Sequence, residues 1–275
     1  MEYAIQIRGL RKSYGNHPVL KGLDFQVRQG EIFALLGVNG AGKTTALECM
    51  EGLRSYDSGE ILVNGRVGIQ LQSASLPEHI KAIEAVRLFA KWRRVPPGKS
   101  RREMPDALGI GEIAQKPYYQ LSTGQKRRLH LALALIGDPD ILFLDEPAAG
   151  LDVEGRAALH QEIRRLQSQG KTILLASHDM AEVESLCSRI AILSDGIIAF
   201  TGTPWELKEK VGTHYHITVR TSAGMESFST DCVEEALPTL FARCREKGTV
   251  ISDLRVDRGS LEEHFLKIAK KEETK

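Results

Sequence analysis

The sequence lacks long apolar runs and has almost no net charge. No uncharged apolar stretch approaches the roughly 18 residues that a membrane span requires. The 37 basic and 36 acidic side chains leave a formal net charge of +1, so no global field attracts nucleic acid or anionic lipid. We therefore expect a chain that does not cross a membrane by itself and has no nucleic-acid partner.

Cysteine is also scarce. The four cysteines form no Cys-x-x-Cys pair and are too few for a disulfide scaffold, so we expect a reduced, cytosolic chain. The first residues contain no basic and apolar signal peptide. The 275 residues, 42% of them hydrophobic, are enough to bury one sizeable core and a smaller one.

One glycine-rich segment has the spacing of a phosphate-binding loop. Residues 37–45 fit the pattern Gly-x-x-x-x-Gly-Lys-Thr, between a predicted buried strand at 32–36 and a predicted helix at 44–50. Backbone N–H groups of such a loop and helix start point at phosphate oxygens, and the lysine adds a full charge. A simple glycine-rich turn would leave the Lys-Thr-Thr run unexplained. The predicted nucleotide contacts here are Gly37, Asn39, Gly40, Ala41, Gly42, Lys43, Thr44 and Thr45.

Two carboxylates, Asp145 and Glu146, follow the apolar run at residues 141–144. Open parallel sheets bind ligands at the carboxyl ends of their strands. Asp145 is suited to hold Mg²⁺, which takes oxygen ligands, and Glu146 is suited to polarise an attacking water. A solvated loop start is the usual alternative for such a pair, but the phosphate loop favours the catalytic interpretation.

A third segment identifies a family. Residues 121–125, Leu-Ser-Thr-Gly-Gln, open a predicted helix over 126–136. They resemble the signature motif of ATP-binding cassette (ABC) ATPases, usually Leu-Ser-Gly-Gly-Gln, from which Thr123 departs. Tyr14 resembles the aromatic residue that stacks on adenine in this family. His178, after a predicted strand, resembles the switch histidine, and residues 149–152 resemble the D-loop.

Gln70 and Gln72 both fit the glutamine that this family carries between its two lobes. Residues 67–72 alternate with period two, which puts both side chains on one side of a predicted strand. Gln72 stands at the strand exit before a short polar loop, as the family pattern suggests. We assign the role to Gln72, with Gln70 as the alternative.

The resemblance covers roughly the first 205 residues and implies an α/β fold. That fold is a P-loop ATPase core with a mostly parallel sheet, an antiparallel β subdomain and an inserted helical subdomain at about residues 76–135. Residues 206–275 form a predicted small α+β accessory domain, with a last helix beginning at Ser260. This extension resembles that of ABC-2 type drug and lipid exporter ATPases. A plain cap on the ATPase is the alternative.

The resemblance also implies a site shared between two copies, either a homodimer or a heterodimer with a related ATPase. Each ATP would lie between the phosphate loop of one copy and Ser122 and Gly124 of the other. Thr44, Gln72 and Asp145 would hold Mg²⁺.

The catalytic set implied by the resemblance is Glu146 as base, with His178 and Gln72. The implied partner is a transmembrane permease subunit, which puts the chain at the cytoplasmic face of the cell membrane. Export is the expected direction, with import and a soluble, non-transport ABC ATPase as alternatives. One cassette instead of two, no long coiled coil and no basic tail argue against the soluble class.

Overall fold

The computed structural model describes residues 2–70, 75–95, 108–210 and 215–258. The chain divides between Thr201 and Gly202 into two compact units. The boundary expected from the sequence, after residue 205, lies close to this division. Within the described ranges, no helix is both long enough and apolar enough to cross a membrane.

A six-stranded sheet forms the centre of the first unit, with the strand order β5-β6-β7-β3-β8-β9. Five of its strands are parallel to their neighbours, and β9 returns from β8 through a turn at Asp195 and Gly196. Both turn residues have positive φ, as a type I′ hairpin requires. The strands are β3 (Ile32–Leu36), β5 (Val67–Gln70), β6 (Ile141–Asp145), β7 (Thr172–Ser177), β8 (Arg189–Ser194) and β9 (Ile197–Gly202).

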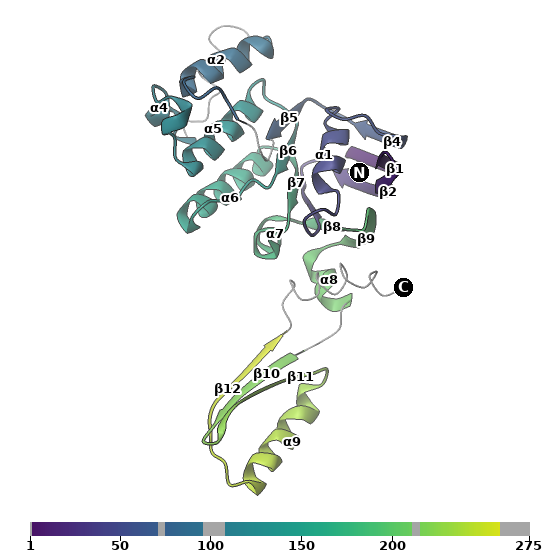
Figure 1. Cartoon of the computed structure of the whole chain (residues 1–275), viewed down its shortest axis with the longest axis vertical. Helices are drawn as coiled ribbons and strands as arrows, with labels where there is room; N and C mark the ends of the chain where they lie inside the picture. Colours follow the sequence, from purple (N-terminus) through teal and green to yellow (C-terminus); the bar gives the residue numbers. More distant parts are fainter. Residues whose placement is uncertain (1, 71–74, 96–107, 211–214, 259–275) are drawn as a thin grey trace. The chain divides into compact units, whose positions relative to one another are not determined.

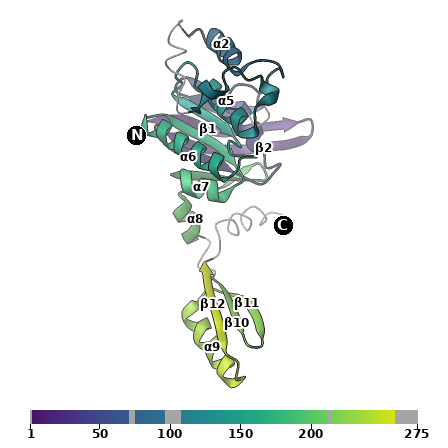
Figure 2. The ribbon, with the colours of Figure 1, turned by 90° about the vertical axis from the view of Figure 1, so that its left-hand side faces the viewer.

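Helices cover both faces of this sheet, which explains why β3, β6 and β7 are buried along their whole length. Helix α1 (Lys43–Met50) lies on one side of β7 in Figure 1 and α6 (Val153–Ser168) on the other. Helix α7 (Met180–Leu186) lies beside α6 in both views of the ribbon (Figure 1 and Figure 2). Apolar runs of five or six residues are therefore strands buried on both faces.

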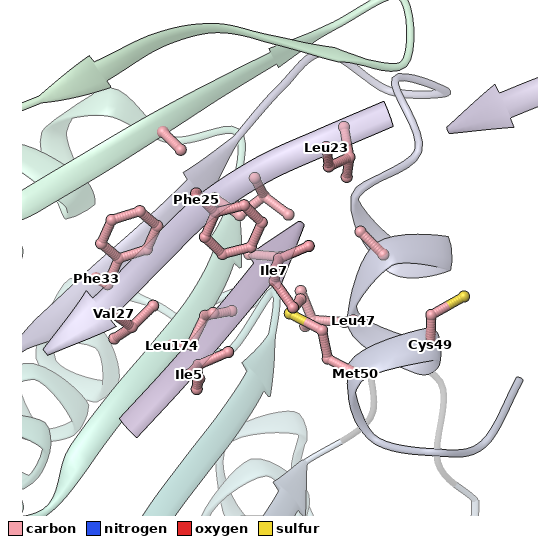
Figure 3. Close-up of a cluster of buried hydrophobic side chains, with 14 of the residues drawn as sticks. Ile5, Ile7, Leu23, Phe25, Val27, Phe33, Leu47, Cys49, Met50 and Leu174 are labelled. Atoms are coloured by element: carbon pink, nitrogen blue, oxygen red, sulfur yellow. The ribbon is translucent and has the colours of Figure 1, made fainter. Parts of the chain in front are cut away.

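A smaller antiparallel sheet, in the order β2-β1-β4, packs over α1. Its strands are β1 (Tyr3–Tyr14), β2 (His17–Arg28) and β4 (Ser58–Val63). Figure 3 shows Leu47 and Met50 of α1 among side chains of this sheet and of the central one. The rings of Phe25 and Phe33 stack with centroids 5.6 Å apart, so the two sheets share one core.

The segment between β5 and β6 contributes helices and no strand where the structure describes it. It contains α2 (Ala82–Trp92), α4 (Ile110–Ile113), a short 3₁₀ helix η2 (Tyr118–Gln120) and α5 (Thr123–Leu135). Helix α5 packs on β5, where a Cβ at Gly68 would lie 2.3 Å from the Ala134 carbonyl oxygen. The predicted fold class, with a mostly parallel sheet, antiparallel strands and inserted helices, is confirmed.

The second unit is a three-stranded antiparallel sheet, in the order β11-β10-β12, with one helix against it. Its small core contains Ile217, Val219, Leu240 and Cys244. The elements are α8 (Pro204–Lys210), β10 (Tyr215–Thr221), β11 (Gly224–Thr230), α9 (Val233–Glu246) and β12 (Ile251–Arg258). The helix predicted from Ser260 lies outside the described residues.

We expect a chain that ends at Lys210 to fold and bind ATP, because each unit has a core of its own and the nucleotide motifs lie in the first. Thermal melting and ATP titration of this truncation, beside the full chain, measure the outcome. If the truncated chain is insoluble or does not bind ATP, the second unit belongs to the catalytic core.

Candidate active site

The candidate site lies where three parallel strands end together. Leu36 of β3 is in register with Ser177 of β7, and Asp145 of β6 is in register with Ala176. The residues that follow these strands therefore emerge at one edge of the sheet. They are the phosphate loop, Glu146 and His178, of which the loop lies about a hundred positions or more before the other two in the sequence.

At Gly37, where the phosphate loop begins, the backbone lies close to the backbone of β8. A Cβ at this position would lie 2.8 Å from the Leu193 carbonyl oxygen and 3.3 Å from Cγ of Lys43. Gly42, immediately before α1, has a φ of 103°, which disfavours a side chain. Of the other predicted contacts, Ala41 is buried, Thr45 is half-buried, and Asn39, Gly40 and Thr44 are exposed.

Lys43 folds back onto its own loop. Its Nζ donates to the carbonyl oxygens of Gly37, at 2.8 Å, and Val38, at 3.3 Å, and lies 3.8 Å from Oε1 of Glu146. Burial lowers the pKa of Lys43, and the charges of Glu146 and Asp145 oppose that shift. The Nζ of Lys43 is held by neutral main-chain acceptors, which an anionic phosphate oxygen can replace.

Asp145 is buried with one oxygen unused. The hydroxyl of Thr44 donates to Oδ2 of Asp145 at 3.0 Å, while Oδ1 has no hydrogen-bond partner among the described residues. Desolvation by burial raises the pKa of Asp145, and the charge of Glu146 adds to the shift. A hydroxyl beside a carboxylate with a free oxygen is an oxygen donor set of the kind that Mg²⁺ binds. The residues present therefore fit a magnesium ion.

A third carboxylate, Glu51 at the end of α1, increases the negative charge near Asp145. Neither of its oxygens has a hydrogen-bond partner in the described part of the chain. Burial raises the pKa of Glu51 to about 7, and the charges of Asp145 and Glu48 add to the effect. Sequence reasoning missed Glu51, because a glutamate at a helix end ordinarily faces solvent.

Glu146 and His178 meet across two strand ends. Nδ1 of His178 lies 2.8 Å from a carboxylate oxygen of Glu146, at hydrogen-bond distance. Glu146 adopts a left-handed φ of 50°, and its N–H donates to the Ala176 carbonyl oxygen at 3.0 Å. Glu146 is 6% exposed, whereas the His178 side chain is 54% exposed. A buried carboxylate thus lies between a lysine ammonium and an accessible imidazole, as a general base beside an anion site would.

Of the remaining predicted site residues, the structure describes Tyr14 and Gln70 but not Gln72. The ring of Tyr14 is partly exposed, with Nζ of Lys12 5.5 Å and Cζ of Arg54 5.3 Å from its centroid. Gln72 lies outside the described residues, so its assignment stays a prediction. Gln70, the alternative, is buried in β5, and its amide atoms have no hydrogen-bond partner among the described residues.

The signature segment forms the start of α5, apart from the strand ends. The Ser122 hydroxyl caps the helix by accepting from the Gln125 N–H at 3.2 Å. In turn, Oε1 of the Gln125 side chain accepts from the Ser122 N–H. This capping box could have been read from the sequence. Gly124 shares a cavity of about 530 Å³ with Ser122 and the beginning of α6. In the described chain, no hydrogen bond or ion pair joins either residue to the phosphate loop or the two carboxylates.

The departure at Thr123 has a structural consequence. A Cβ at Gly150 would lie 3.3 Å from the Thr123 methyl carbon, and the φ of Gly150 is 74°. The threonine methyl group thus occupies space beside a glycine of the segment that resembles the D-loop. The signature segment and the start of α6 are neighbours within one chain.

Comparisons with known proteins agree with this geometry. The family described as "ABC transporter" matches residues 20–149. The Nod factor export ATP-binding protein I of Ralstonia nicotianae is 38% identical over 218 residues, which cover 74% of this chain and 68% of that protein. The daunorubicin resistance ATP-binding protein DrrA3 of Streptomyces coeruleorubidus is 31% identical over 299 residues, 96% of this chain and 95% of that protein.

Solved structures have the same architecture. An ATP-binding subunit of an ABC transporter matches with a TM-score of 0.70 and 26% identity, over 75% of this chain and 92% of that chain. A dimeric bacterial ABC transporter cassette matches in fold with a TM-score of 0.66 and 24% identity, over 72% and 98%.

The fold and the strand-end site define an α/β ATPase with a phosphate-binding loop. The chain belongs to the ABC transporter family, of which it is an ATP-binding member and an ATP hydrolase. The resemblance predicted from the sequence is confirmed.

We expect Gly37→Ala to weaken ATP binding at least about tenfold and to destabilise the fold by about 1–3 kcal/mol. The added methyl group would meet a backbone carbonyl of β8 and push against the Lys43 side chain. Gly111→Ala is the matched control, because nothing lies within 4 Å of its Cβ position. Calorimetric ATP titration and urea unfolding of both variants measure the effect; an unchanged ATP affinity for Gly37→Ala would contradict the described loop.

Proposed function

We propose that this chain is the ATP-binding and hydrolysing subunit of an ABC exporter and that it drives a separate transmembrane permease subunit. It would act at the cytoplasmic face of the cell membrane. Support for export comes from relatives named for Nod factor export and for daunorubicin and linearmycin resistance. Support for ATP hydrolysis comes from the buried Glu146 carboxylate, which lies between Lys43 and His178.

In the proposed mechanism, the backbone N–H groups of residues 40–45 and the ammonium of Lys43 bind the phosphates of ATP. Lys43 would exchange its bonds to loop carbonyls for bonds to phosphate oxygens, so that charged acceptors replace neutral ones around the buried ammonium. Tyr14 would offer its ring to adenine in place of the cations that flank it.

Thr44, Asp145 and Gln72 are the residues that we propose hold Mg²⁺. The unpaired Oδ1 of Asp145 and the adjacent Thr44 hydroxyl support this assignment. When bound, the ion supplies positive charge that stabilises the phosphate oxygens.

Glu146 accepts a proton from the attacking water in this proposal. Its buried carboxylate is held by a backbone bond to β7 and by His178, so it needs no large movement to act. As an imidazolium, which donates from both ring nitrogens, His178 would orient Glu146 and donate toward the terminal phosphate.

The site is complete only in a dimer, in which Ser122 and Gly124 of a second copy close over the phosphates. Their separation from the strand-end residues within one chain supports this arrangement, as does the position of Ser122 at the start of α5, because helix N-termini favour anions. The second copy is either identical or a related ATPase.

We expect Glu146→Gln to keep ATP affinity within a few-fold while turnover falls at least about 100-fold, because the amide cannot accept the proton. The variant should accumulate as an ATP-bound dimer, measured by sedimentation with and without ATP. Adding Ser122→Arg should abolish that dimer but not ATP binding, whereas Lys43→Ala should lose ATP affinity itself. Hydrolysis by Glu146→Gln within a few-fold of the original chain would refute the assigned base.

The export proposal predicts a stable partner in the membrane. Affinity purification of the Glu146→Gln chain from detergent-solubilised membranes, with ATP present, should recover an integral membrane protein in stoichiometric amount. The same purification with the Lys43→Ala chain is the control for nucleotide dependence. Recovery with ribosomes or DNA instead of a membrane protein would establish the soluble alternative.

A further inference from the structure

Three side chains on one face of α6 contact α7 and the turn before it. Arg156, His160 and Arg164 recur at intervals of four, so they share one face of the helix. Nη1 of Arg156 donates to Oδ2 of Asp179 at 2.7 Å, and Nη2 of Arg164 donates to the Ser185 carbonyl oxygen at 2.7 Å. His160, between the arginines, faces α7, which lies beside α6 in Figure 2.

Glu182 of α7 holds the turn that carries His178. The hydroxyl of Ser177 donates to Oε2 of Glu182 at 2.6 Å and accepts the Asp179 N–H at 3.1 Å. Oδ1 of Asp179 in turn accepts the N–H groups of Ala181 and Glu182, at 2.9 and 3.1 Å. Ser177, before His178, thus bonds the Glu182 carboxylate directly, and Asp179, after His178, is linked to it through the Ser177 hydroxyl. Glu182 is 3% exposed.

The same carboxylate faces His160 across a gap. Nε2 of His160 and Oε1 of Glu182 are 3.7 Å apart, about 0.8 Å longer than a typical N–H···O bond. Neither atom has a hydrogen-bond partner in the described chain. Burial is the first cause that raises the pKa of Glu182 and lowers the pKa of His160. The other charged groups around the pair are Arg156, Arg164, Asp179 and Glu146.

We propose that Glu182 is a positioning residue for His178, and that His160 makes this position depend on α6. The proposal rests on the catalytic role proposed above for His178. Helix α6 begins at Val153 with Asp152 as its N-cap, directly after the segment beside Thr123, which in a dimer would lie near the partner. A sub-ångström shift of α6 would change the His160–Glu182 distance, and with it the anchor of the turn that holds His178 against Glu146.

A purely structural role for Glu182 makes a different prediction. If the carboxylate only stabilised α7, its loss would lower the melting temperature and would reduce activity to the same degree whether or not His178 is present. A positioning residue acts through His178, so its effect must disappear when His178 is removed.

The test is a double-mutant cycle. Glu182→Ala should lower the turnover number about 10- to 100-fold with the ATP dissociation constant within threefold, since misplacing a catalytic group by about 1 Å has effects of this size. In a His178→Ala background, the same substitution should change turnover less than twofold. Glu182→Gln should restore most activity, because its amide oxygen accepts from Ser177. Gln161→Ala, on the exposed side of α6, is the matched control.

If Glu182→Ala fails to fold, Ser177→Ala is a second test variant. It removes the same hydrogen bond between Ser177 and Glu182 with little change in side-chain volume. His160→Leu should lower turnover less than Glu182→Ala and have no effect in the Glu182→Ala background. Equal losses from Glu182→Ala with and without His178, or turnover of Glu182→Ala and Ser177→Ala within twofold of the original chain, would overturn the proposal. Glu146→Gln tests the hydrolytic site separately, so the two failures are distinguishable.

Discussion

The parallel register of β3, β6 and β7 is the constraint on which the rest of the site depends. Leu36 lies opposite Ser177, and Asp145 lies opposite Ala176, so three chain segments leave the sheet at the same level. A slip of one residue in β6 would turn Asp145 away from Thr44, because successive strand side chains alternate between faces. Full burial of these strands by helices on both faces resists such a slip.

Burial then determines the chemistry of the charged groups. The pKa of Lys43 is lowered and those of Asp145 and Glu51 are raised, each chiefly because water is excluded. The protein stabilises these charges in part, through the bonds of Lys43 to two loop carbonyls, the Lys43–Glu146 contact and the Thr44 hydroxyl. Phosphates and a divalent cation would supply the missing counter-charges, which gives a physical reason for coupling between nucleotide binding and the conformation of the site.

Several elements could be predicted from the sequence because their apolar pattern is strong. The strands expected at 32–36 and 141–144 correspond to Ile32–Leu36 and Ile141–Asp145. Strand β11 has no comparable pattern, because only Phe228 and Thr230 are even half-buried and its sequence shows no apolar alternation. The register of β12 against β10 shifts between Asp253 and Ile251, which interrupts its period of two.

The sequence by itself determined the phosphate loop, the Asp145–Glu146 pair and the signature segment, because each is a short motif whose function depends on neighbouring residues. Only the tertiary structure decided which motifs meet. The left-handed backbone at Glu146 aims its carboxylate at His178, 32 positions away, and Glu182 reaches Ser177 from the next helix. Such contacts depend on strand order and helix packing, and neither is encoded in the spacing of residues along the chain.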